Sequence, residues 1–227
     1  MPTVLITGAS RGIGLEFAKQ YADDGWKVIA TCRDPGGANE LKGLAGKVEV
    51  HALDITDRGQ IQALAKSLKR ENIDILINNA GIYGPKPALL GGINYGAWEE
   101  VMRTDAMSPL KVSECFLDHI ARGKMKKIIA ISSKMGSISD NSSGGSYIYR
   151  SSKAALNAVM KSLSIDLKER GVVVALLHPG WVKTDMGGPG ALIDSRESVS
   201  KMRDVIAGLG PEQSGGFFGF DGERISW

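Results

Sequence analysis

Short apolar runs alternate with segments of helical periodicity along the whole chain, and this alternation constrains the fold more than any other feature. A continuous apolar run of strand length is typical of a strand buried on both faces, and helices between such strands cover those faces. The pattern predicts an α/β fold with a doubly wound parallel sheet of about seven strands between two helical layers. The predicted strands are Thr3–Thr7, Lys27–Cys32, Val48–Leu53, Ile73–Asn78, Lys127–Ser132, Val172–Leu177 and Gly216–Phe220.

Two of the intervening helices have clear apolar stripes. One stripe runs through Gly14–Ala22 and predicts a helix that ends near Gly25. The other runs through Ile61–Leu68, where either Thr56 or Asp57 is placed to cap the helix start. Neither an internal repeat nor a linker-like stretch divides the sequence, so we expect residues 1–227 to form a single domain.

Composition excludes several classes of function. The chain is 43% hydrophobic and 23% charged, as in ordinary globular proteins, and its formal charge of +3 favours neither nucleic acid nor a membrane surface as a partner. We expect the basic run Arg122–Lys127 to end a helix on a solvated face. Two cysteines form no disulfide framework, and with no export signal or membrane-length apolar run we expect a cytoplasmic protein. The histidines lack ligand spacing, so we expect no metal site; they are His51, His119 and His178.

A glycine-rich segment links the first predicted strand to the first helix. Glycine lets the backbone approach a pyrophosphate there, and the N–H groups at the helix start attract its charge. A plain strand-to-helix turn would also use glycine, but nucleotide binding is the favoured interpretation. The candidate phosphate-binding residues are Gly8, Ser10, Arg11, Gly12, Ile13 and Gly14.

The end of the second strand indicates which dinucleotide the chain prefers. An acidic side chain at this position would bind the ribose 2′-hydroxyl of NAD, whereas a basic one would accommodate a 2′-phosphate. Arg33 stands there, and Arg11 is a second cation within reach. Asp34 is the competing acid, but it precedes Pro35 and is expected in the outgoing turn. The sequence therefore predicts a preference for NADP(H), with NAD(H) possible.

A phenol and an ammonium at helical spacing are the candidate proton-transfer groups. Tyr149 and Lys153 are four residues apart, which places them on one face of a helix. A tyrosine with an ordinary pKa of about 10 is a poor acid-base catalyst near neutrality, and a nearby lysine favours its phenolate. Tyr147 is the alternative, but the residue four positions on from it is Ser151. Such pairs arise often by chance, so the assignment depends on the surrounding motifs.

These motifs occur in an order that resembles the short-chain dehydrogenase/reductase family from Thr3 to the C-terminus. They are the turn Thr7–Gly14, the element Asn78–Gly81, the Tyr149–Lys153 pair and the Pro179–Gly180 turn. The resemblance implies a Rossmann-type doubly wound sheet in three αβα layers. It also implies further cofactor contacts, namely Asp54, Ile55, Asn79, Ala80, Gly81, Tyr149, Lys153, Pro179, Gly180, Val182 and Thr184. Polar groups at strand ends can also be simple backbone caps.

The resemblance further implies a serine that binds the substrate oxygen. Ser133, at the end of the fifth strand, is the preferred candidate, with Ser132 and Ser146 as alternatives. Ser133 lies sixteen residues before Tyr149, a longer separation than is usual in the family, so Gly136–Ser146 is expected to contain a small insertion.

Asp105 departs from the family pattern, in which an asparagine stands at this position. We predict that one helix contains both Trp98 and Val112 and places Asp105 on its apolar stripe. Pro109 has no N–H to bond the carbonyl of Asp105, so this carbonyl could still bind the water that the family uses in proton transfer. A buried Asp105 carboxylate would favour the Lys153 ammonium and oppose a Tyr149 phenolate, which would shift the activity optimum to higher pH.

The expected function is interconversion of a small carbonyl compound and its alcohol, with Ser133, Tyr149, Lys153 and Asp105 as the catalytic group. The alternatives are a catalytically weak nucleotide-binding sensor or signalling protein and an epimerase or dehydratase that retains its cofactor. The ending Gly216–Gly222 is similar to a compact branch of the family with C-factor signal proteins and sniffer-type carbonyl reductases. The resemblance also implies a homodimer or homotetramer, and the glycine-rich segment Thr184–Ser195 is expected to be a mobile loop over the site.

Overall fold

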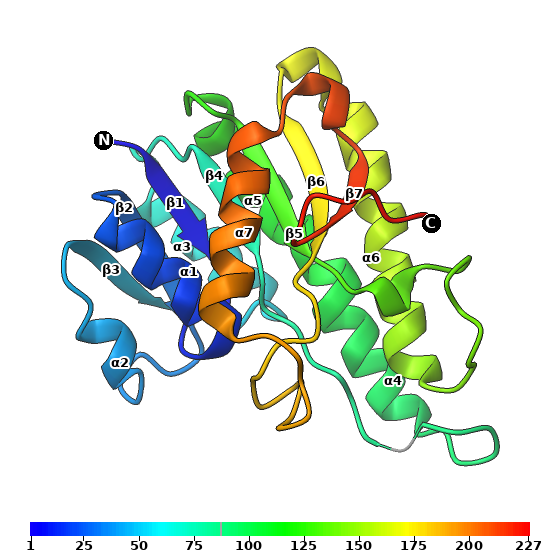
Figure 1. The fold of residues 1–227 in the computed structure, drawn as a ribbon. Helices are drawn as coiled ribbons and strands as arrows, with labels where there is room; N and C mark the ends of the chain where they lie inside the picture. Colours follow the sequence, from blue (N-terminus) through cyan, green and yellow to red (C-terminus); the bar gives the residue numbers. More distant parts are fainter. Residues whose placement is uncertain (87) are drawn as a thin grey trace.

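A single sheet of seven strands organises the protein. The structure, a computed structural model, describes residues 1–86 and 88–227. The strand order is β3-β2-β1-β4-β5-β6-β7, and every neighbouring pair is parallel (Figure 1). The predicted doubly wound parallel sheet is thereby confirmed. The strands are β1 Thr3–Ile6, β2 Lys27–Cys32, β3 Lys47–Ala52, β4 Ile75–Asn78, β5 Lys127–Ile131, β6 Val173–His178 and β7 Gly216–Gly219.

Helices connect the strands and cover both faces of the sheet (Figure 1). The α-helices are α1 Gly12–Asp23, α2 Asn39–Lys42, α3 Arg58–Ser67, α4 Tyr95–Met102, α5 Ser108–Ala121, α6 Tyr147–Asp166 and α7 Ser195–Gly208. Short turns of other helical types are the π-helical turn η1 Arg103–Met107 and the 3-10 turns η2 Lys134–Gly136, η3 Lys168–Arg170 and η4 Pro211–Gln213. Among the described residues, no helix is both long enough and apolar enough to span a membrane.

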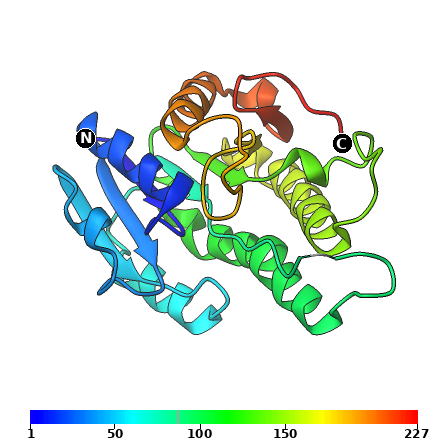
Figure 2. The same ribbon diagram turned by 60° about the horizontal axis from the view of Figure 1, so that its bottom comes forward.

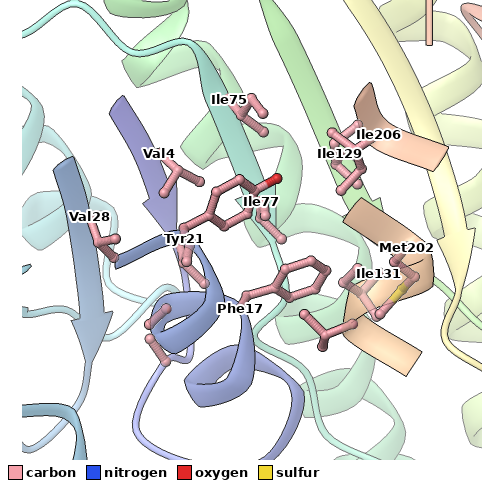
Figure 3. Packing of buried hydrophobic residues seen from close by; sticks show 14 of the residues in the cluster. Val4, Phe17, Tyr21, Val28, Ile75, Ile77, Ile129, Ile131, Met202 and Ile206 are labelled. Atoms are coloured by element: carbon pink, nitrogen blue, oxygen red, sulfur yellow. The ribbon is translucent and has the colours of Figure 1, made fainter. Parts of the chain in front are cut away.

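Successive residues of each central strand face opposite helical layers. Val4 and Ile6 of β1 belong to the core beneath α1 and α7, whereas Leu5 belongs to the core beneath α3, α5 and α6. Figure 3 shows the first of these cores, in which Phe17 and Tyr21 of α1 lie over strand side chains beside α7. The two cores explain why the strands are apolar on both faces.

Strand boundaries differ from the predicted ones by one or two residues. The largest shift is at β4, which begins at Ile75, although the apolar run begins at Ile73. Asp74 causes this difference, because its carboxylate accepts hydrogen bonds from the backbone N–H groups of Thr3 and Lys124, both at 2.8 Å. An apolar run does not reveal where a side chain replaces the sheet's own hydrogen bonds.

The helix starts and ends follow local chemistry. Asp57 is the cap of α3, and its carboxylate accepts from the backbone N–H groups of Gly59 and Gln60, which decides between Thr56 and Asp57. Helix α1 ends at Asp23, two residues before Gly25, as predicted.

The expectation that the whole basic run Arg122–Lys127 lies on a solvated face is wrong for Lys127. Arg122 caps the end of α5 on the surface, but Lys127 begins β5 and is buried. Its ammonium donates to the carbonyls of Ile206 at 2.6 Å and Ala207 at 3.1 Å, at the C-terminal end of α7. The negative end of a helix stabilises a cation there. Burial lowers the pKa of the Lys127 ammonium.

The helix predicted to run through both Trp98 and Val112 is interrupted. Helices α4 and α5 are joined by the π-helical turn η1, which contains Asp105. The Ser108 N–H bonds to the Arg103 carbonyl five residues earlier, and the Ser108 hydroxyl donates to the same oxygen at 2.8 Å. Pro109 removes one ordinary helical hydrogen bond just beyond this turn. The wider turn therefore lies where the sequence predicts a free carbonyl.

All seven strands end at the same edge of the sheet, and the loops that follow them lie side by side there. In Figure 1 this edge is at the bottom, and in Figure 2 it comes forward, with the loop between β6 and α7 in front of its middle. Ligands of open parallel sheets bind at this edge. The site is therefore sought among these loops.

We predict that Phe17→Ala destabilises the protein by about 3–5 kcal/mol, because it removes a fully buried ring between α1 and the sheet. Urea unfolding measures this change. Lys19→Ala, on the exposed side of the same helix, should change the free energy of unfolding by less than about 0.5 kcal/mol. Equal effects of the two substitutions would contradict the assignment of Phe17 to the core.

Candidate active site

A cavity of about 490 Å³ lies at the carboxyl edge of the sheet. Several loops form its walls, namely those that follow β1, β2, β3, β4 and β6, together with the start of α1 and part of α6. Among the predicted site residues, the lining contains Gly8, Ser10, Arg11, Gly12, Ile13, Gly14, Arg33, Asp54, Ile55, Asn79, Ala80, Gly81, Tyr149, Lys153, Pro179 and Thr184. Most of the residues singled out from the sequence are thus brought together.

The glycine turn between β1 and α1 requires glycine for steric reasons. Gly8 has a φ of +66°, and a Cβ on it would lie 2.8 Å from the Cα of Ala80. A Cβ on Gly14 would lie 2.3 Å from the Gly8 carbonyl oxygen. Asn79 binds this turn to β4, since its side-chain amide donates to the carbonyls of Thr7 at 2.9 Å and Gly8 at 3.0 Å. The backbone thereby forms a close-packed cradle that a side chain would fill.

The chemistry of the cradle fits the phosphates of a dinucleotide. Arg11, the N-cap residue of α1, makes no side-chain hydrogen bond to the first turn, so the N–H groups there are available to an anion. Arg33 lies exposed at the edge of the cavity, whereas Asp34 lies outside its lining. The Arg11 guanidinium pairs at 3.1 Å with Asp185, in the loop between β6 and α7, and this partner had no signal in the sequence.

Asp54 lines the cavity but also organises its own turn. Its carboxylate accepts from the backbone N–H of Thr56 at 2.8 Å and from the Thr56 hydroxyl at 2.7 Å. These hydrogen bonds hold the pKa of Asp54 below its ordinary value. The local capping role that the sequence left open is therefore present, at a position that also faces the cavity.

Tyr149 and Lys153 lie on the inner face of α6, as their spacing predicts, and both side chains are buried. The Lys153 ammonium is 3.3 Å from the carbonyl oxygen of Ile131 and 3.3 Å from a carboxylate oxygen of Asp105. It also lies 5.6 Å from the centroid of the Tyr149 ring. The phenol and the ammonium are thus neighbours at the inner wall of the cavity.

The three candidate serines have different surroundings. The Ser133 hydroxyl accepts from the backbone N–H of Met135 at 3.2 Å, and hydrogen bonding by Ser133 lowers the pKa of the Tyr149 phenol, although less than burial raises it. Ser132 donates to the side-chain oxygen of Asn157 at 2.7 Å, so its hydroxyl is already engaged. Ser146 lies beside Tyr83, with the two hydroxyl oxygens 3.3 Å apart. Of the three, Ser132 lines the cavity, whereas Ser133 and Ser146 lie outside its lining.

Asp105 is fully buried and has three partners. Besides the Lys153 ammonium, its carboxylate accepts from the backbone N–H of Ile82 at 2.9 Å and from the Ser152 hydroxyl at 3.4 Å. Gly81 packs directly over the pair, since a Cβ there would lie 3.2 Å from Asp105 Oδ1 and 3.4 Å from Lys153 Nζ. A buried carboxylate needs such partners to offset its desolvation.

The pKa shifts follow from burial and from this pair. Burial raises the pKa of the Tyr149 phenol; the Lys153 ammonium lowers it and Asp105 raises it, and the net direction is upward. Burial lowers the pKa of Lys153, but Asp105 and Tyr149 outweigh this effect and hold it above the ordinary value. Both shifts favour the protonated forms, the phenol of Tyr149 and the ammonium of Lys153.

Only some of the predicted residues after β6 line the cavity. Pro179 and Thr184 line the cavity, whereas Gly180 and Val182 lie outside the lining. Gly180 packs against Ile193 and Phe220, and Val182 is buried and bridges to Ile193. These two residues shape the loop that reaches the cavity.

One aromatic residue beside the site was not predicted from the sequence. Tyr83, two positions after Gly81, stacks on Tyr149 with ring centroids 4.3 Å apart. Its proximity to a recognised motif was the only available signal. His178 lies in a separate cavity of about 370 Å³, where burial lowers its pKa to about 4. No cluster of three or more potential metal ligands occurs within residues 1–86 and 88–227.

The chain is similar in sequence and in fold to known proteins. A family model described as short chain dehydrogenase matches residues 2–190. The chain is 42% identical over 167 residues to the C-signal protein of Myxococcus xanthus, an alignment that covers 74% of this chain and all of that protein.

Two solved structures resemble the whole chain. The carbonyl reductase Sniffer of D. melanogaster superposes with a TM-score of 0.93 at 33% identity and full coverage of both chains. An NADPH-bound carbonyl reductase from chicken fatty liver superposes with a TM-score of 0.92 at 37% identity, covering 100% of this chain and 99% of that one.

We predict that Asp105→Asn lowers the pKa of the Tyr149 phenol, because it removes the buried anion that raises it. A spectrophotometric titration of phenolate measures this pKa when the curve of a matched Tyr149→Phe variant is subtracted in each background. The melting temperature provides the control for folding. An unchanged or higher phenol pKa would show that the Asp105 charge does not act on Tyr149.

Proposed function

Because the chain belongs to the short-chain dehydrogenase family, we propose that it is an NADP(H)-dependent oxidoreductase that interconverts a small carbonyl compound and its alcohol. The observation that supports this proposal most directly is the arrangement of Ser133, Tyr149 and Lys153 beside a cavity with a glycine-rich phosphate cradle. A nicotinamide bound there would supply the hydride. The protein's own groups would orient the carbonyl and move the proton.

In the reducing direction the phenol of Tyr149 donates its proton to the carbonyl oxygen. Its raised pKa keeps that proton in place at neutral pH, and the Ser133 hydroxyl orients the same oxygen. The Lys153 ammonium, held by Ile131 and Asp105, stabilises the phenolate that forms. In the oxidising direction the phenolate accepts the proton of the alcohol, so oxidation is favoured at higher pH.

The proposed proton supply passes through a water molecule at the π-helical turn that contains Asp105. The π-helical turn and Pro109 leave the carbonyl of Asp105 available to a water molecule. Such a water would connect the Lys153 ammonium with solvent. In this proposal the backbone of Asp105 takes part in the relay, and its carboxylate adjusts the charge of the site.

The preference for NADP(H) rests on charge. Arg33 lines the cavity beyond β2, and Arg11 lines it at the start of α1, where it pairs with Asp185; Asp34, the acid of the β2 turn, is outside the lining. Two cations at this end would bind a 2′-phosphate more strongly than a hydroxyl. The NADPH bound to the chicken carbonyl reductase is consistent with this choice.

A sensor or signalling role with little catalysis is the less favoured alternative. The similarity to C-signal raises it, but a protein with no need for proton transfer would have no reason to bury a phenol beside an ammonium and a serine hydroxyl. Fold and relatedness alone do not assign an activity. The Tyr149 substitution below distinguishes the two functions.

We expect Tyr149→Phe to lower kcat for carbonyl reduction at least about 100-fold, because it removes the proton donor. The affinity for NADPH, followed by its fluorescence, should remain nearly unchanged. Tyr147→Phe, which alters an exposed tyrosine on the same helix, should retain wild-type kcat. A panel of aldehydes and ketones serves as substrate, and full activity of the Tyr149 variant would refute the proposed mechanism.

We expect Arg33→Ala to weaken NADPH binding about 10- to 100-fold, the loss of one charge-assisted contact, while NADH binding stays the same. Titration calorimetry with both cofactors measures this. Arg70→Ala, an exposed arginine outside the cavity lining, is the matched control. If Arg33→Ala weakened both cofactors equally, the residue would have no part in selecting between them.

A further inference from the structure

We propose that Tyr83 positions Tyr149 and covers one face of its ring during proton transfer. This proposal rests on the proposed function, in which Tyr149 is the proton donor. The two rings stack with centroids 4.3 Å apart and planes inclined by 20°. One face of the Tyr149 ring is therefore covered by protein, and a substrate cannot lie on that face.

Tyr83 also contacts the two segments that bring Tyr149 and Ser133 into the site. Its hydroxyl oxygen is 3.3 Å from that of Ser146, which directly precedes α6. The same hydroxyl lies 3.9 Å from the sulfur of Met135, two residues after Ser133. One side chain thus joins the turn after β4, the turn after β5 and the start of α6.

The start of α6 needs such support. Ser146 has a φ of +45°, in the left-handed region that is unfavourable for a residue other than glycine. The hydrogen bond between the hydroxyls of Tyr83 and Ser146 helps to hold this conformation, and the conformation sets the direction in which α6 begins. Because Tyr149 lies in the first turn of α6, the contact acts on the position of its phenol.

Tyr83 is itself held from both sides. The backbone N–H of the preceding residue, Ile82, donates to Asp105, which ties Tyr83 to the buried ion pair. The Lys86 ammonium lies 4.0 Å from the centroid of the Tyr83 ring. Since Tyr149 covers one face of this ring, the ammonium lies on the other. Lys86, Tyr83, Tyr149 and Lys153 therefore form a series of cation, ring, ring and cation.

The stack has an electrostatic consequence for Tyr149. The face of an aromatic ring is the negative part of its quadrupole and disfavours an anion beside it. Tyr83 also excludes water from one face of the phenol. Both effects oppose the phenolate, in the same direction as burial and Asp105, and they keep the proton on Tyr149 until a carbonyl arrives.

The test compares Tyr83→Phe with Tyr83→Leu. The phenylalanine keeps the stack and loses the hydroxyl contacts, whereas the leucine loses both. We expect Tyr83→Leu to lower kcat about 3- to 10-fold, as the loss of an aromatic pair implies, and to move the alkaline limit of carbonyl reduction to lower pH. Tyr83→Phe should keep the wild-type alkaline limit, because the stack remains, and should lose about 2-fold in kcat, because the hydroxyl contacts with Ser146 and Met135 are removed.

Two controls separate positioning from general damage. The affinity for NADPH should be unchanged in both variants, because Tyr83 lies outside the lining of the cofactor cavity. Tyr95→Leu, which alters a tyrosine that is 69% exposed on α4, should leave kcat and the pH profile as in the wild type. An unchanged alkaline limit in Tyr83→Leu, or equal shifts in the Phe and Leu variants, would overturn the proposal.

Failure of the proposed function can be recognised separately. If the wild-type protein reduces no carbonyl compound, the pKa of Tyr149 is still measurable as phenolate absorbance, with the matching Tyr149→Phe variant subtracted in each background. A lower phenol pKa in Tyr83→Leu, but not in Tyr83→Phe, would support the electrostatic effect of the stack without any turnover. The same pKa in all backgrounds would reject it.

Discussion

The parallel pairing of all seven strands is the constraint on which the rest of this structure depends. Each ladder of backbone hydrogen bonds aligns neighbouring strands in the same direction, so every strand ends at one edge of the sheet. Residues that are far apart in sequence meet there. Asn79, after β4, bonds to the carbonyls of Thr7 and Gly8, after β1, across more than seventy positions. The cavity is a consequence of this topology, and the loops determine its chemistry.

Within that frame, the buried pair of Asp105 and Lys153 determines the charge of the site. Removing two ions from water costs several kcal/mol for each. Their mutual attraction offsets this cost only when further hydrogen bonds satisfy the remaining donors and acceptors of both ions. Ile82, Ser152 and Ile131 provide those bonds. Asp105 helps to keep Lys153 charged, and burial, with a smaller contribution from Asp105, raises the pKa of Tyr149 against the lowering by Lys153, so the site as a whole favours a protonated phenol. This property suits proton donation to a carbonyl.

Similarity alone leaves the activity open. The chain is 42% identical to a protein named as a signal and 33% to 37% identical to carbonyl reductases that match it over its whole length. Members of one fold serve different functions, so the assignment must come from the residues of the site. The combination of Ser133, the stacked Tyr83 and Tyr149, and the paired Lys153 is the reason we favour catalysis.

The sequence by itself determined the fold class, the strand and helix order, and the position of most residues around the cavity, because apolar periodicity and glycine-rich turns are local properties of the chain. Only the tertiary structure decided the exceptions. Lys127 is buried because α7 ends above β5, and Asp105 is paired because the turn that contains it lies against Lys153 of α6. Tyr83 reaches Tyr149 only because the segment after β4 lies beside the start of α6. Contacts between distant segments leave no periodic signal, and they set the charge and shape of the site.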